Sequence, residues 1–284
     1  KHNAQLKINQ LKTLPSLPEA SVKILEAVYD PDISIEQLAA VLALCPGLVA
    51  RLLGLANSAY FGQSRQIKDL RTAVVQVLGL QLVKSLTVGI VLNVQIDTRQ
   101  CQAFDTQSFW LHSLLTAVCA QKLAPLRSGD ALCRSSVYTG GLLLHIGLLV
   151  IAYLFPKELN KLLVGQSLSY PALERLLKDE LGVSHFQVGY MLLRKWRLPE
   201  VYQQILSHFE DRRFTGEVHP QIVILQASQQ MCYLLMGDDL DVNAVLQTIA
   251  DSYGLPIEAL TSLFAELAEN KENIQKLADV MTNG

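Results

Sequence analysis

The chain has 284 residues, of which 50% are hydrophobic and only 18% are charged. This composition excludes an intrinsically disordered protein, because disordered chains have few apolar residues and a high charge. The 24 basic and 26 acidic residues leave a net charge of -2. Composition therefore predicts neither a nucleic acid nor a membrane as a partner.

The charge is unevenly distributed along the chain. Residues 1–209 carry a net charge of +6, whereas residues 210–284 carry -8. We expect this boundary to separate two structural units, or an acidic face that meets a basic one. The C-terminal segment also contains apolar stripes that need a surface to cover, so we predict that it docks on the rest of the chain.

The cysteines point to a reducing compartment. Five occur, at positions 45, 101, 119, 133 and 232, without a C-x-x-C motif. An odd number with no paired spacing indicates buried, reduced thiols rather than a disulfide framework or a zinc ribbon. The first residues, KHNAQLKINQLKT, lack the apolar stretch of a signal peptide. We therefore expect a cytoplasmic protein.

Apolar residues recur with helical spacing, and capping residues mark several helix starts. Ser34 is predicted to cap one helix, with Gln37 completing a capping box. The other predicted helices lie after Pro18, at 69–79, at 105–122, at 169–181, at 183–197, at 200–210, after Asp241 and after Pro256. No window alternates with period two, so we predict an all-α fold, a multi-helix bundle with short connections.

One stretch is apolar enough to cross a membrane. From Ser135 to Pro156 the chain runs SSVYTGGLLLHIGLLVIAYLFP without a formal charge, which meets the length of a membrane-spanning helix. We interpret it instead as the core helix of a helical domain, because a histidine and three glycines interrupt it and the neighbouring segments are amphipathic. We expect Val137–Tyr153 to be buried and no membrane to be bound.

A second stretch reads like a helix-turn-helix. In IEQLAAVLALCPGLVARLLGL the first helix would hold Leu38, the turn Ala43, and the second helix Val49 and Arg51. Only Arg51 in the second helix could contact a base or a phosphate, whereas direct readout uses several polar side chains. A DNA-binding regulator is therefore the weakest of our alternatives, and we expect no nucleic acid partner.

Four of the six histidines fall inside or at the start of predicted helices: His112, His145, His185 and His208. Helical proteins that hydrolyse phosphoesters bring several His and Asp side chains onto a divalent metal, which polarises the phosphate and activates water. A single histidine on a helix is more often a packing or surface residue than a ligand. Four of them leave open either a shared cavity or separate structural roles.

The segment NSAYFG at 57–62 has the composition of a structural corner. Asn57 tolerates the conformation that ends a helix, and Tyr60 and Phe61 can anchor the following loop. The alternative is a partner-binding turn formed by Asn57, Ser58, Tyr60 and Phe61. Both interpretations stay open at this stage.

Five motifs occur in order along residues 14–211: the string from LPSLPEASVKILEAVYD to NSAYFG, VLGLQLVKSL, FWLHSLLTA, GGLLLHIGLLV and GVSHFQVGYMLLRKWRLPEVYQQILSHFED. Together they resemble the HDOD family, the output-domain relatives of the HD metal-dependent phosphohydrolases. The resemblance implies an HD-like core at 101–211 and a helical part before it at 14–100. An extension at 1–13 and an acidic helical segment at 212–284 would flank this domain.

The family's signature pair is missing. Members commonly carry GLLHDIG where this chain has GLLLHIG at 141–147, so the His and Asp positions hold Leu144 and His145. Leucine cannot bind a metal, and replacing a carboxylate by an imidazole removes a charge that Mg²⁺ or Mn²⁺ needs. We therefore predict a degenerate pocket, with no catalytic residue, no metal and no cofactor, formed by His112, Leu144, His145, His185 and His208.

The resemblance implies a bacterial, non-catalytic signal-transduction or regulatory output domain that binds a protein partner or a small ligand. The alternative is a metal-dependent phosphohydrolase that acts on a nucleotide or a cyclic dinucleotide through an unusual histidine-rich site. In that case Zn²⁺ or another transition metal would be held by His112, His145, His185 and His208, because imidazole suits such ions.

Overall fold

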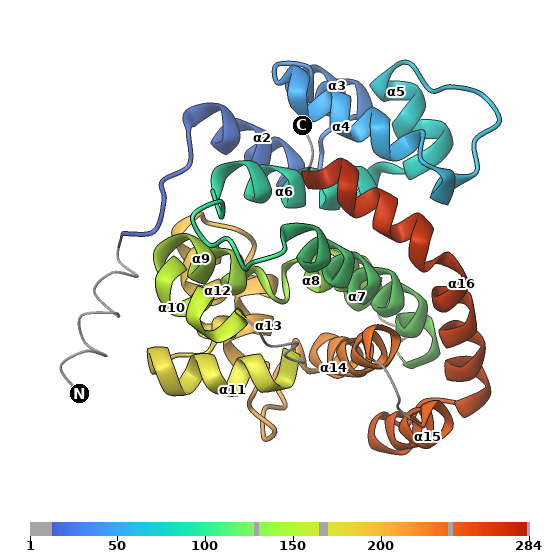
Figure 1. Cartoon of the computed structure of the whole chain (residues 1–284). Coiled ribbons are helices and arrows are strands. Elements are labelled where there is room, and N and C mark those ends of the chain that lie inside the picture. The colour runs from blue at the N-terminus through green and yellow to red at the C-terminus, as the bar shows by residue number, and fades with distance from the viewer. Residues whose placement is uncertain (1–12, 128–130, 165–169, 238–240, 283–284) are drawn as a thin grey trace.

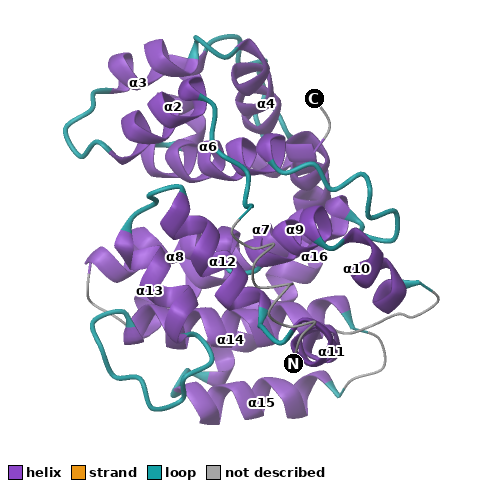
Figure 2. Ribbon diagram, turned by 90° about the vertical axis from the view of Figure 1, so that its left-hand side faces the viewer, coloured by secondary structure: helices purple, strands orange, loops and turns teal. Residues whose placement is uncertain are grey.

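The computed structural model describes residues 13–127, 131–164, 170–237 and 241–282. Within these ranges every regular element is a helix, which confirms the all-α prediction. The helices form two groups that lie one above the other in Figures 1 and 2. The predicted extension at 1–13 lies outside the described residues except for Thr13.

The upper group in Figure 1 precedes residue 96 in the chain. Its elements are α2 (Glu19–Tyr29), α3 (Ile35–Leu42), α4 (Pro46–Ala56), η1 (Ala59–Phe61), α5 (Leu70–Thr72), η2 (Ala73–Leu78) and α6 (Leu80–Gln95). The predicted capping box is present, because the Ser34 hydroxyl accepts from the Gln37 amide and the Gln37 side chain accepts from the Ser34 amide. Such caps matter because helices this short are marginal on their own.

The lower group is built around one long helix, α7 (Thr106–Arg127), which α8, α14 and α16 cover. The other elements of this group are α8 (Ala131–Leu143), α9 (Ile146–Leu154), α10 (Pro156–Leu163), α11 (Tyr170–Leu181), α12 (His185–Lys195), α13 (Glu200–His208), α14 (His219–Met236), α15 (Val242–Tyr253) and α16 (Ile257–Thr282). Helix α7 is apolar on nearly all sides because it has neighbours on nearly all sides.

Most of the apolar stretch at 135–156 is buried core, as predicted, but Tyr153 is 37% exposed, and the stretch forms two helices instead of one. Helix α8 ends at Leu143 and α9 begins at Ile146, so Leu144 and His145 form the turn between them. By length and composition alone, residues 133–154 could cross a membrane, yet 89% of the most apolar window is buried inside the fold. The break positions His145 at a junction of two helices.

The C-terminal helices pack on both groups. Helix α14 lies against α7, and α16 runs from α15 along α7 towards α4 and α6 (Figure 1). The end of α16 fits against two glycines: a Cβ atom on Gly54 would lie 3.0 Å from Val280, and one on Gly89 would lie 2.8 Å from Met281. Helix α16 therefore braces the two groups.

A half-buried amide connects α16 to α7. The Asn93 side chain of α6 donates to the Met281 carbonyl of α16 at 3.1 Å. It also accepts from the indole N–H of Trp110 on α7 at 2.8 Å. One side chain thus satisfies polar groups on two other helices.

The helix-turn-helix stretch forms α3 and α4, with Ala43 at the C-cap of α3. The inner face of α4 is buried through Leu48 and Leu52 and serves packing. Arg51 lines a cavity of about 620 Å³ that α4 shares with the ends of α6, α7 and α16.

Candidate functional site: a buried histidine cluster

Three of the four predicted histidines meet in the lower helix group. His112 comes from the middle of α7, His145 from the turn between α8 and α9, and His185 from the first turn of α12. The His145 Nδ1 and His185 Nε2 atoms lie 2.8 Å apart, a hydrogen-bond distance. The ring centroids of His112 and His145 are 4.9 Å apart. We name these three residues the histidine cluster.

The glycines of the GLLLHIG motif bring the cluster together. A Cβ atom on Gly147 would lie 1.8 Å from the His185 carbonyl oxygen, and one on Gly141 would lie 2.6 Å from Ala117 Cα. Both distances are far below van der Waals contact, so only glycine lets α9 approach α12 and α8 approach α7 this closely. These approaches bring His145 within reach of His185.

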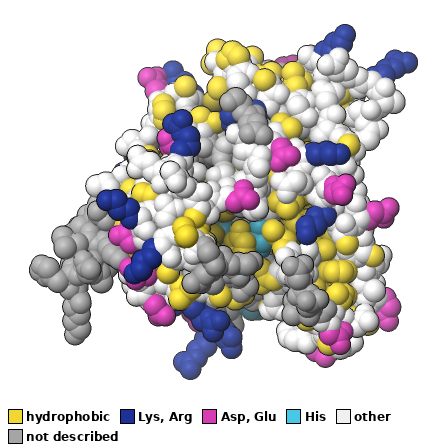
Figure 3. Space-filling view, viewed as in Figure 1, with side chains coloured by type: hydrophobic (Ala, Val, Ile, Leu, Met, Phe, Trp, Pro, Cys, Tyr) yellow, Lys and Arg dark blue, Asp and Glu magenta, His cyan; other side chains and the backbone are white. Residues whose placement is uncertain are grey.

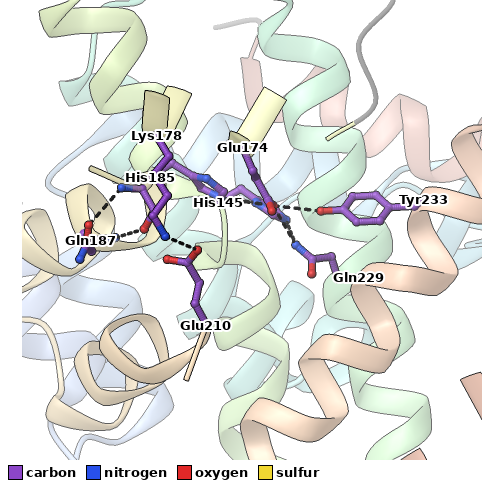
Figure 4. A network of polar contacts seen from close by, with 9 residues as sticks. His145, Glu174, Lys178, His185, Gln187, Glu210, Gln229 and Tyr233 are labelled. Carbon is purple, nitrogen blue, oxygen red and sulfur yellow. Dashed lines mark hydrogen bonds and ion pairs between the residues drawn. The ribbon is translucent and has the colours of Figure 1, made fainter. Parts of the chain in front are cut away.

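Three polar side chains that the sequence did not single out complete the site (Figure 4). Gln229 of α14 lies 3.3 Å from His145 Nε2 and donates to Glu174 Oε1 of α11, also at 3.3 Å. Tyr233, one turn later on α14, donates to the same Glu174 oxygen at 3.1 Å. That oxygen lies 4.0 Å from His185 Nε2.

Burial decides the charge of these groups. It lowers the pKa of His112 and of His185 to about 3. The pKa of His145 is also well below its usual value, because of burial and then of the two neighbouring histidines. Burial raises the pKa of Glu174 to about 7, against the hydrogen bonds from α14. The imidazoles are therefore neutral at pH 7, and the contact between His185 and Glu174 is not an ion pair.

Aromatic rings cover the cluster. Tyr170, the first residue of α11, stacks on His112 with ring centroids 4.0 Å apart and planes at 13°, and Phe186 packs on His185 at 4.0 Å. His112 is 1% exposed, and His145 and His185 are fully buried. Figure 3 shows histidine atoms near the centre of this face, recessed among hydrophobic side chains. A ligand would have to displace these rings to reach the cluster.

Within the described residues, three ring nitrogens of the cluster have no hydrogen-bond partner: both nitrogens of His112 and Nδ1 of His185. Buried polar atoms are nearly always paired, and an unpaired one costs on the order of 1–3 kcal/mol. The three nitrogens are available to a water molecule, an ion or a ligand.

The site has a donor set for one metal ion. His145, Glu174 and His185 each offer a ligand atom, and these atoms lie within 4.8 Å of one another. Ligand atoms on a tetrahedral Zn²⁺ are about 3.3 Å apart, between the 2.8 Å of the histidine pair and the 4.0 Å from His185 to Glu174. Two imidazoles and one carboxylate fit Zn²⁺ or a similar transition metal, and they do not fit a pair of hard ions such as Mg²⁺.

The structure places His208 away from the other three histidines. It ends α13, stacks on Phe214 with ring centroids 4.1 Å apart, and lines a separate surface cavity. Leu144 lies next to His145 in the turn and is fully buried. Of the predicted five-residue pocket, the structure thus brings together three histidines and adds Glu174.

The NSAYFG corner lies in the upper helix group and closes a loop. The Asn57 side chain accepts from the Ile67 amide at 2.7 Å and donates to the carbonyls of Leu53 and Ile67 at 2.8 and 2.9 Å. The rings of Tyr60 and Phe61 are half-buried and meet edge to face at 5.0 Å. Asn57 therefore has an anchoring role, and partner binding at Ser58 and its neighbours stays a prediction.

The model of the HDOD domain matches residues 14–211 of the chain. The chain belongs to the HDOD family. A Treponema pallidum (strain Nichols) protein of uncharacterised function is 31% identical to it over 237 residues, which are 81% of this chain and 44% of that protein. The chain thus spans less than half the length of this curated relative.

Solved structures share the fold over almost the whole chain. A Shewanella amazonensis SB2B protein, provisionally named a phosphohydrolase, has a TM-score of 0.76 and 22% identity over 97% of both chains. A Marinobacter aquaeolei VT8 protein, provisionally named a signal transduction protein, has a TM-score of 0.77 and 22% identity over 99% of this chain and 67% of that one. An HDOD domain protein of unknown function from Geobacter sulfurreducens has a TM-score of 0.73 and 23% identity over 99% and 98%. At these identities the likeness shows the HD-like fold and not an activity.

Proposed function

We propose that this HDOD protein is a cytoplasmic regulatory output domain that works by binding a protein partner or a small ligand and not by catalysis. The observation that carries the proposal is the sequence of the turn between α8 and α9. When GLLLHIG is aligned on its glycines with the GLLHDIG string that is common in the family, Leu144 and His145 stand where that string has its His-Asp pair. The leucine is fully buried and offers no ligand atom. His145 brings no carboxylate that could bridge two ions.

The closed state of the histidine cluster supports the same proposal. A hydrolase must admit a phosphoester to its metal, whereas the three histidines are at most 1% exposed and Tyr170 lies flat on His112. The name of the Marinobacter relative, a provisional signal transduction protein, agrees with a regulatory role.

Metal analysis paired with activity assays tests the proposal. We expect protein expressed in metal-supplemented medium to hold far less than one divalent ion per chain. We also expect no phosphate release from nucleotide monoesters, phosphodiesters or cyclic dinucleotides. Stoichiometric metal together with turnover that disappears in His112→Ala would overturn the proposal.

A metal-dependent phosphohydrolase is the second candidate, and the donor set of His145, Glu174 and His185 favours it. A transition-metal ion bound there would polarise a phosphate and activate water. The role of Tyr233 would be to hold the Glu174 carboxyl in place through its 3.1 Å hydrogen bond.

Matched glutamine variants separate the two candidates. If the site binds metal, Glu174→Gln and His185→Gln lose the ion, while His208→Gln, which changes a histidine outside the cluster, keeps it. Equal metal content in all three variants would show that the ion sits elsewhere and would remove the support for the second candidate.

A further inference from the structure

A cavity of about 380 Å³ lies where the two helix groups meet, outside the histidine cluster. Its walls are residues 16–17, one face of α2 and the turn at 195–198 between α12 and α13. Small-molecule pockets commonly have this size and commonly form at such junctions. The cavity is therefore a candidate ligand site that the HD-like core forms only together with α2 and the segment before it.

The walls are mainly apolar and are held in place before any ligand arrives. Leu25 and Leu198 are buried, and the ring of Trp196 stands between the two groups. The Trp196 indole donates to the Pro15 carbonyl at 2.7 Å, and the Lys195 ammonium donates to the carbonyl of the preceding residue, Leu14. These two bonds fasten the segment before α2 to the turn, so a ligand meets a preformed surface.

The cavity also carries charge. Glu26, Lys195 and Arg197 line it, which gives a net charge of +1. The Lys195 ammonium is engaged by the backbone. Within the described part of the chain no hydrogen bond or ion pair engages the Arg197 guanidinium, which is exposed. One free cation beside one carboxylate suits a monoanion better than a doubly charged phosphate.

The backbone at Arg197 is strained. Its φ of 54° makes it the one non-glycine residue with positive φ in the described ranges. The Leu198 amide donates to the Leu193 carbonyl at 2.9 Å, and the Arg197 amide to the Arg194 carbonyl at 3.2 Å. This pair of bonds is the Schellman motif, in which the left-handed residue is usually glycine. An arginine at this position lowers stability, and strained residues of this kind cluster at ligand sites.

We propose that this cavity binds a small amphipathic monoanion, an apolar body with one carboxylate, and that Arg197 pairs with the carboxylate. The proposal rests on the regulatory binding role proposed above and specifies the chemistry of one ligand. Because α2 belongs to the upper group and the turn to the lower, the bound molecule contacts both groups and stabilises their arrangement.

Octanoate is the probe, with octan-1-ol and octylammonium as neutral and cationic analogues of the same chain length. Calorimetric titration of the full chain should show one octanoate site, with a dissociation constant at least about fivefold lower than for either analogue. In Arg197→Gly the affinity for octanoate should fall about tenfold, while the melting temperature rises by about 2 °C because glycine relieves the positive φ. A residue with only a structural role would not move affinity and stability in opposite directions.

Three further variants complete the test. Arg194→Ala removes a cation from the same helix end outside the cavity and should leave the octanoate affinity unchanged within about twofold. Glu26→Gln should tighten binding severalfold, because it removes the opposing charge. Val22→Phe should block the site, since Val22 lines the cavity from α2 and is 37% exposed, so a larger ring there does not disturb the core.

Equal binding of the three probes, an unchanged affinity in Arg197→Gly, or no octanoate binding at millimolar concentration would each overturn the proposal. Circular dichroism of every variant verifies that it is folded. The titration requires neither metal nor turnover, so its failure would leave the non-catalytic proposal standing. Metal-dependent turnover at the histidine cluster would likewise leave the titration result unchanged.

Discussion

Two of the buried polar side chains of helix α7, Trp110 and His112, have different surroundings. The Trp110 indole donates to Asn93, which in turn donates to the Met281 carbonyl, so each of these groups has a partner. Both ring nitrogens of His112 lack a hydrogen-bond partner among the described residues. The Trp110 region is thus a satisfied hydrogen-bond network, whereas the histidine cluster leaves ring nitrogens unpaired among the described residues.

The difference follows from what faces each side chain. Trp110 faces an amide, whereas His112 faces the rings of His145, Tyr170 and Tyr233. A carboxylate at position 145, as in the signature of the family, could accept a hydrogen bond from His112. The imidazole that stands there is paired with His185 instead. Among the described residues, position 145 therefore supplies His112 with neither a negative charge nor a hydrogen-bond partner.

Among the substitutions considered, Gly147→Ala should have the largest effect, because it disrupts the packing of α9 against α12 that holds the histidine cluster together. A Cβ atom there would lie 1.8 Å from a backbone oxygen of α12, and backbone cannot move aside as a flexible side chain can. We expect a loss of about 4 kcal/mol or more in unfolding free energy, measured by chemical denaturation.

Gly47→Ala is the matched control, because this exposed helical glycine has nothing within 4 Å of an added Cβ. It should stabilise the protein by about 0.5–1 kcal/mol. A cost below about 1 kcal/mol for Gly147→Ala would mean that α9 and α12 are not held in the tight contact described above.

Acid should destabilise the protein through the cluster. The three histidines bind protons near pH 6.5 when unfolded, but in the folded protein the pKa of His112 and His185 is about 3 and that of His145 is also depressed. Between these pH values the unfolded chain binds more protons, so stability falls as the pH is lowered. Glu174 acts in the opposite direction between pH 4.5 and about 7, because its folded pKa is raised.

Three histidines lower the stability on acidification and one glutamate raises it, so the net effect is that of two titrating groups. The unfolding free energy should therefore fall by about 2.7 kcal/mol per pH unit between pH 6 and 4.5. Denaturation series at several pH values measure this slope. His112→Leu should reduce it by about 1.4 kcal/mol per pH unit, since one titrating group is gone. A flat pH dependence would show that the cluster is open to water and titrates normally.

Asn93→Ala should disrupt the hydrogen-bond network around Trp110, with a smaller effect on stability. It leaves the Trp110 indole and the Met281 carbonyl without partners, which we expect to cost about 2 kcal/mol. Asn270→Ala is the control, because the one hydrogen bond of this half-buried side chain within the described residues is exposed and goes to the Glu266 carbonyl of its own helix. A cost below about 0.5 kcal/mol for Asn93→Ala would show that α16 is braced by apolar packing alone.

The two regions also differ in how far the sequence could predict them. Helices and caps such as Ser34 follow from local pattern, which is why the helical fold could be predicted. The break at Leu144 could not, because no proline or cap marks it and it depends on the close contact between Gly147 and α12. Rules based on neighbouring residues in the sequence cannot predict contacts between helices that are distant in the chain.

The polar shell of the cluster was missed for a similar reason. Glu174 flanks an apolar stripe of α11 in the same way as any surface glutamate, so nothing in the sequence marks it as half-buried. Gln229 and Tyr233 did leave a signal, since they are polar residues in a helix whose neighbours are largely buried and apolar. The sequence groups His208 with the cluster because it is a histidine in a predicted helix, but its place at the end of α13 separates it from the other three.

The smallest expected effect, that of His112→Leu, tests most directly whether the histidine cluster differs from the Trp110 network. His112→Leu at neutral pH removes two unpaired nitrogens and replaces the ring by an apolar side chain of similar size, while it loses the stacking on Tyr170. These contributions oppose each other, so the unfolding free energy should change by less than about 1 kcal/mol.

Trp110→Phe should cost about 2 kcal/mol, because it leaves the Asn93 oxygen unpaired and shrinks a fully buried ring. A cost above about 2 kcal/mol for His112→Leu would mean that the His112 nitrogens have a bound partner in solution. The cluster would then be a binding site, and elemental analysis of the wild-type protein would decide whether that partner is a metal ion or water.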